Sequence, residues 1–167
     1  MSKLQCLLVA VLFLLTAPLS APAANTARPP VLSALQKHEI VYAYQRGGMR
    51  LAAIVYQESS GCVFLRDKSN RLVYGCGHLN INTVAKVVGF PVNSWMLTHD
   101  FELNINIAAE LLNQCTQVFG FYGGITCYYS GAPAARAMTR YQLLHSQYLA
   151  TIQTRMMELQ AIPVDTE

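Results

Sequence analysis

Glu58 is the residue whose type and position point most directly to chemistry. It follows the apolar residues 54–56 and precedes Ser59-Ser60-Gly61, whose small side chains leave room beside the carboxyl group. Apolar surroundings and the negative end of a helix both favour the protonated form of a carboxyl group. A protonated carboxyl near neutral pH is what a general acid requires. A single glutamate in such a place is more commonly a solvated residue at a helix end, so the surrounding pattern decides between the two interpretations.

Four short motifs follow one another along the chain. They are Gln57-Glu58-Ser59-Ser60-Gly61, then Gly75-Cys76-Gly77-His78-Leu79, then Asn104-Ile105 with Ala108-Ala109, and finally Cys127-Tyr128-Tyr129-Ser130-Gly131. Each of these strings is common by chance when it is taken alone. Their order and spacing, within residues 35–148, therefore carry the argument.

In this order the motifs resemble those of lytic transglycosylases, the lysozyme-like enzymes that cut peptidoglycan. The first resembles the motif of the family's catalytic glutamate, the second its Gly-Leu-Met-Gln motif, and the fourth its Ala-Tyr-Asn-x-Gly motif. The resemblance implies that Glu58 is catalytic. It also implies that four further residues contact the saccharide, namely Ser60, His78, Tyr128 and Tyr129. His78 stands where the family has glutamine, and Tyr129 stands where it has asparagine. The predicted saccharide contacts therefore depart from the family pattern, whereas the catalytic glutamate, Glu58, matches it.

The reaction that the resemblance implies needs one carboxyl group. The glutamate protonates the glycosidic oxygen between N-acetylmuramic acid and N-acetylglucosamine, and then takes the proton of the muramic C6 hydroxyl. That hydroxyl attacks C1 of its own sugar and closes a 1,6-anhydro ring. Because the nucleophile is intramolecular, its high effective concentration replaces a second catalytic group.

Two other functions remain open on the sequence alone. Ordinary glycosidases use two carboxyl groups, and Asp67 is the nearest candidate partner for Glu58. The first alternative is therefore a lysozyme-type hydrolase that uses Glu58 with Asp67 or with a water held by polar side chains. The second alternative is a non-catalytic peptidoglycan-binding or assembly protein that retains the fold, which the unusual His78 and Tyr129 motivate.

The sequence disfavours several other chemistries. The four histidines show no His-x-x-x-His spacing, and no phosphate-binding glycine loop is present. We therefore expect no metal and no cofactor. The net charge of +3 comes without a strongly basic patch, so we also expect no nucleic-acid partner.

The amino terminus predicts export to the periplasm. Lys3 precedes an apolar run over residues 4–15, and an Ala-x-Ala pattern follows at residues 21–23. This is the pattern of a cleaved signal peptide, here residues 1–24. An uncleaved membrane anchor is the alternative, but the run is shorter than the ~20 residues that a spanning helix needs.

The cysteines that remain after cleavage predict two disulfides. They are Cys62, Cys76, Cys115 and Cys127, an even number in an exported protein, and no Cys-x-x-Cys spacing suggests zinc. Three pairings are possible. We favour Cys62–Cys76 with Cys115–Cys127 because each pair joins nearby segments.

The chain predicts one domain of the mainly α class, lysozyme-like by resemblance, with a small irregular or β-like insertion. Only 13% of the residues are charged and 53% are hydrophobic, which argues against disorder. We assign residues 25–30 to a linker, 31–162 to the domain and 163–167 to a tail. Predicted helices cover residues 31–46, 49–57, 82–88, 100–119 and 125–130, with glycines between several of them.

One further long helix is predicted after Pro133. Its apolar stripe consists of Tyr141, Leu144, Tyr148, Ile152, Met156 and Leu159, at steps of three and four residues.

The expected partner of the domain is the peptidoglycan glycan strand, bound by a monomer. Small signal-bearing members of the resembling family often serve envelope-spanning secretion, conjugation or pilus machines, so the resemblance also implies such a machine as a partner.

Overall fold

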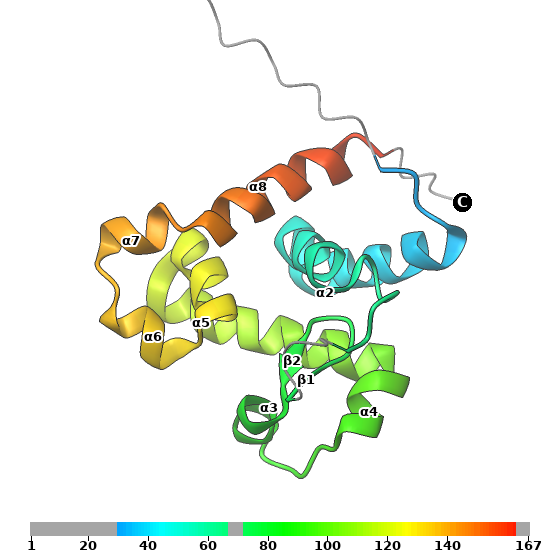
Figure 1. Cartoon of the computed structure of the whole chain (residues 1–167), viewed down its shortest axis with the longest axis horizontal. Coiled ribbons are helices and arrows are strands. Elements are labelled where there is room, and N and C mark those ends of the chain that lie inside the picture. Colours follow the sequence, from blue (N-terminus) through cyan, green and yellow to red (C-terminus); the bar gives the residue numbers. More distant parts are fainter. Residues whose placement is uncertain (1–29, 67–71, 163–167) are drawn as a thin grey trace, which may run out of the picture.

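The computed structural model describes residues 30–66 and 72–162. The predicted signal peptide, residues 25–29 of the linker, Asp67 and the tail lie outside the described residues. Within them the chain is mainly α with a small β insertion (Figure 1), as predicted from the sequence. The elements are α2 (Ala34–Ser59), β1 (Val73–Tyr74), β2 (Leu79–Asn80), α3 (Ile81–Val88), α4 (Ser94–His99), α5 (Phe101–Ser130), α6 (Ala132–Ala137), α7 (Arg140–Leu144) and α8 (Gln147–Gln160).

Helix α2 is the central element of the core. It begins with a capping box at Ser33 and bends at Gly47 and Gly48, where the backbone leaves the helical region. The predicted interruption at the two glycines is therefore confirmed, although the helix resumes at once. After the bend, residues 51–55 are at most 1% exposed, because α2 packs against both α5 and α8 (Figure 1). This burial fixes the end of α2, where Glu58 lies.

Helix α5 crosses the molecule below α2 in the view of Figure 1. Asp100 caps its first turn by accepting a hydrogen bond from the Leu103 N–H, so the predicted start is confirmed. The backbone is non-helical at Gly120, and the predicted helix 125–130 is the second part of α5. Gly124 does not interrupt the helix. A Cβ there would lie 2.9 Å from the Thr116 Cα, so this glycine permits a close backbone approach.

The prediction of one long final helix is wrong. The segment forms α6, α7 and α8, which are separated at Met138 and His145. Thr139 starts α7 with a capping box, and the Ser146 hydroxyl accepts the Leu149 N–H at the start of α8. These caps satisfy the free backbone N–H groups in the first turns of α7 and α8, and each cap therefore begins a new helix. Helix α4 was not predicted; its cap is Asn93.

The small β insertion consists of two antiparallel strands that pair Val73 with Asn80 and Tyr74 with Leu79. It is the small β-like insertion that the sequence predicted. Within residues 30–66 and 72–162, none of the helices is long and apolar enough to span a bilayer.

Candidate active site

Glu58 lies in the last turn of α2 with its side chain 17% exposed. The turn that follows is fixed from inside. The Ser59 hydroxyl donates to the Val55 carbonyl and accepts the Cys62 N–H, each at 2.9 Å. Ser60 ends the helix in the left-handed conformation, with φ 54°. The Glu58 carboxyl therefore projects from a rigid helix end and not from a loose loop.

Two side chains from distant segments hold the two carboxyl oxygens of Glu58. The Tyr148 hydroxyl, from the first turn of α8, donates to Oε1 at 2.5 Å. The His78 Nδ1, from the turn before β2, lies 3.4 Å from Oε2. The structure thus brings Glu58 and His78, two of the predicted site residues, together, and it adds Tyr148.

Sequence reasoning missed Tyr148 as a contact of Glu58, because its place in an apolar stripe indicated core packing. Burial raises the pKa of the Tyr148 hydroxyl well above its ordinary value, and the charge of Glu58 raises it further. The hydroxyl therefore remains protonated near neutral pH and remains a hydrogen-bond donor. One signal could have found it, since a buried tyrosine hydroxyl normally has a hydrogen-bond partner.

The turn that presents His78 is held by three kinds of contact. The Cys62–Cys76 disulfide ties it to the end of α2. Asn104 of α5, which is fully buried, accepts the Gly77 N–H at 2.8 Å and donates to the carbonyls of Tyr74 and Leu97. Gly75 has φ 77°, and a Cβ there would lie 2.1 Å from the Leu97 carbonyl oxygen. The second and third motifs of the sequence therefore form one interlocked support.

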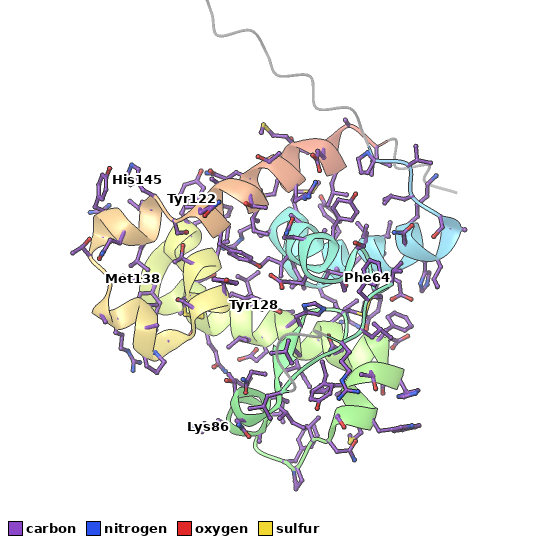
Figure 2. All side chains as sticks on the ribbon, viewed as in Figure 1. Phe64, Lys86, Tyr122, Tyr128, Met138 and His145 are labelled. Atoms are coloured by element: carbon purple, nitrogen blue, oxygen red, sulfur yellow. A yellow bond between two sulfur atoms is a disulfide. The ribbon has the colours of Figure 1, made fainter. Side chains whose placement is uncertain are left out.

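Tyr128 belongs to this support. Its hydroxyl donates to the Gly77 carbonyl at 2.7 Å, and Figure 2 shows the residue near the centre of the molecule. Burial raises the pKa of the Tyr128 hydroxyl well above its ordinary value, and the nearby Glu58 charge adds to the shift. In this structure the hydroxyl thus contacts the turn backbone beside Glu58.

The two other predicted saccharide contacts differ in exposure. Tyr129 is 66% exposed, and its ring stacks on that of Tyr148 with 4.4 Å between the centroids. Ser60 is half-buried at the helix end, where its backbone carbonyl accepts a hydrogen bond from Gln36. Tyr129 therefore offers an open aromatic face next to the tyrosine that contacts Glu58.

Both predicted disulfide pairings are confirmed. Cys62 is joined to Cys76, and Cys115 is joined to Cys127 within α5. Glu39 lies close to the first disulfide, and these three residues form a group of potential metal ligands within the described part of the chain. Because both thiols are used in the disulfide, the group offers a single carboxylate and is not a metal site in the oxidised protein.

An apolar cavity of about 620 Å³ lies elsewhere, between the first half of α2 and the end of α8. Its described lining residues include Tyr44, Met49 and Leu159 but no carboxylic acid, so it provides no acid for cleaving a sugar bond.

The Glu58 centre combines a partly buried carboxyl group, a neutral phenol donor, an imidazole and an exposed aromatic ring. Such a set can transfer a proton to an oxygen atom and back. Asp67, the candidate second carboxylate, lies outside the described residues. Comparisons of the chain with protein-family models, with curated proteins and with solved structures find no match.

Proposed function

We propose that this protein is a peptidoglycan lytic transglycosylase. It cleaves the bond between N-acetylmuramic acid and N-acetylglucosamine and leaves 1,6-anhydro-muramic ends. The observation that carries the proposal is the convergence of Tyr148 and His78 on the two oxygens of Glu58. This convergence supports an acid–base role for the same glutamate that the motif order selects.

In the proposed reaction Glu58 first acts as an acid and then as a base. The carboxyl group gives its proton to the glycosidic oxygen as the bond to C1 breaks. The carboxylate then accepts the proton of the C6 hydroxyl as the new C6–O–C1 bond forms, which restores the acid. The Tyr148 hydrogen bond is strongest while the carboxylate is charged, so it stabilises the state that forms during proton transfer.

The proposed saccharide contacts surround this carboxyl group. The open ring of Tyr129 offers a surface for the apolar face of a pyranose, since it is 66% exposed and is held in place by stacking on Tyr148. Ser60, His78 and Tyr128 are the other residues that the family resemblance places at the saccharide. Of these, Tyr128 shapes the site through its bond to the Gly77 carbonyl.

The proposal includes the location and the partners that the sequence predicts. The protein is exported to the periplasm, acts as a monomer on glycan strands, and opens the wall locally for an envelope-spanning secretion, conjugation or pilus machine. The two disulfides are compatible with an oxidising compartment.

The test is digestion of purified sacculi, with mass spectrometry of the released fragments. We expect the wild-type protein to release fragments with anhydro-muramic ends and Glu58→Gln to release none. Glu102→Gln is the matched control, because it makes the same chemical change at an exposed glutamate in the first turn of α5. This control should digest at the wild-type rate.

Each alternative function has its own result in the same experiment. Reducing ends in place of anhydro ends would assign the protein to the hydrolases. Binding to sacculi without any digestion by the wild type would assign it to the non-catalytic binding proteins. Digestion by Glu58→Gln at the wild-type rate would remove Glu58 from the mechanism.

A further inference from the structure

The hydrogen bonds around Glu58 determine which carboxyl oxygen carries the acid proton. The Tyr148 hydroxyl donates to Oε1, so Oε1 is an acceptor and the proton of the neutral acid is on Oε2. His78 Nδ1 lies 3.4 Å from that same oxygen, and both side chains are mostly buried, at 14% exposure for His78 and 17% for Glu58. The proton therefore lies on the side of the carboxyl group that faces the imidazole.

The tautomer of His78 follows from its other nitrogen. Nε2 lies 2.9 Å from the Phe64 carbonyl oxygen. A carbonyl oxygen only accepts hydrogen bonds, so Nε2 carries the hydrogen. In the neutral imidazole Nδ1 is then the unprotonated acceptor. An acceptor nitrogen thus faces the oxygen that carries the proton.

The His78 ring is held in this orientation by its backbone as well. The residue adopts a left-handed conformation, with φ 47°, and its N–H donates to the Gly75 carbonyl at 3.0 Å. The Cys62–Cys76 disulfide and the buried Asn104 fix the same turn. A left-handed backbone at a non-glycine residue is costly and persists where the surroundings enforce it.

We propose that His78 is a positioning residue for Glu58, and that it accepts a hydrogen bond from the Oε2–H group and so keeps the acid proton on that oxygen. This inference rests on the proposed function and goes beyond the saccharide contact that the family resemblance assigns to this position. The separation of 3.4 Å shortens when substrate orders the site, as catalytic hydrogen bonds commonly do.

The proton balance of the reaction leaves His78 unchanged. Glu58 gives the Oε2 proton to the glycosidic oxygen while the bond from that oxygen to C1 breaks. The C6 oxygen bonds to C1, and its proton returns to Oε2. His78 keeps its own proton on Nε2 throughout and neither gains nor loses one. It acts through Glu58 and not on the sugar.

Two conservative variants separate this role from a saccharide contact. In His78→Asn the side-chain amide occupies the position of Nδ1, whereas in His78→Gln it reaches the position of Nε2 and leaves Oε2 without its partner. We expect His78→Asn to keep kcat within about threefold of the wild type. We expect His78→Gln to lower kcat by roughly ten- to a hundredfold with KM unchanged, because a misplaced catalytic group costs up to about 10²-fold.

The opposite result would overturn the inference. Glutamine is the residue of the resembling family at this position, so a saccharide contact predicts that His78→Gln retains kcat or changes KM. Equal losses of kcat in both variants would also count against the role of Nδ1. The rates are compared at a temperature at which circular dichroism shows both variants folded, since asparagine tolerates the left-handed backbone better than glutamine.

Nitrogen NMR of the protein labelled with ¹⁵N-histidine provides a readout that a merely structural role would not produce. The His78 signals, assigned by their loss in His78→Asn, should report the Nε2–H tautomer with Nδ1 as acceptor. The Nδ1–H tautomer would refute the proposal. Failure of the proposed function is distinct, because in that case the wild type releases no anhydro-muramic ends, or Glu58→Gln itself digests sacculi at the wild-type rate. If Glu58→Gln is inactive while His78→Gln matches the wild type, only the role of His78 fails.

Discussion

Replacing Tyr148 with phenylalanine removes one hydroxyl group from the centre of the proposed active site. The ring remains, and with it the stacking on Tyr129 at 4.4 Å. The hydrogen bond to Glu58 Oε1, 2.5 Å long, is lost. Because this bond strengthens as the carboxylate forms, its loss raises the barrier to proton transfer more than it weakens substrate binding.

The expected size follows from the charge on the acceptor. Hydrogen bonds to charged groups contribute about 1.5–3 kcal/mol, and each 1.36 kcal/mol corresponds to about a tenfold change in rate. Tyr148→Phe should therefore lower kcat by about 10- to 150-fold with little change in KM. The assay is the initial rate at which the variant releases fragments from saturating sacculi.

The matched control is Tyr141→Phe, because that ring is 69% exposed and stacks on His145. Figure 2 places His145 at the periphery of the molecule, beside α7. This variant should keep the wild-type rate. A Tyr148→Phe rate within twofold of the wild type, with the variant folded, would refute the acid–base arrangement described for Glu58.

Two further predictions concern stability. Among the described residues, Oε2 of the buried Glu39 has no hydrogen-bond partner, and burial raises the pKa of this carboxyl above its usual 4.5. Its stabilising, protonated form is therefore lost as pH rises above about 4.5. The free energy of unfolding of Glu39→Gln, measured in urea at pH 7, should be about 1 kcal/mol higher than that of the wild type. This difference should disappear below pH 4.5, and equal unfolding midpoints at pH 7 would contradict the prediction. Replacing either cysteine pair with serines should lower the free energy of unfolding by about 3 kcal/mol, the size expected for loops closed over sequence separations of 14 and 12 residues. Loss of Cys62–Cys76 should also lower the rate at a temperature where the protein stays folded, whereas loss of Cys115–Cys127 should not; equal effects on the rate would count against the support assigned to the first disulfide.

The sequence predicted the elements whose signals are local. The helix at 82–88, the start at Asp100 and the bend at the two glycines 47 and 48 are confirmed, because caps and glycines act within a few residues. The sequence selected both Glu58 and His78 as site residues, but only through a resemblance to the motifs of a known family, and it did not predict the contact between the two side chains.

The contacts that sequence reasoning missed depend on tertiary structure. Tyr148 and Glu58 are 90 residues apart, and a helical stripe gives no indication of which hydroxyl in it points at a carboxyl group. Because the same apolar stripe predicted one continuous helix, the breaks before α7 and α8 were missed. The capping box at Thr139 and the cap at Ser146 were readable signals, and weighting them over the apolar repeat would have placed Tyr148 at the start of a new helix.

In the proposed function, Glu58 cleaves glycan strands by intramolecular attack of the muramic C6 hydroxyl. The most direct test of this proposal is the mass of the strand ends that the wild-type protein releases from purified sacculi. We expect anhydro-muramic ends, which are lighter than reducing ends by one water, and no release by Glu58→Gln. Reducing ends from the wild type, or release by Glu58→Gln at the wild-type rate, would contradict the proposal.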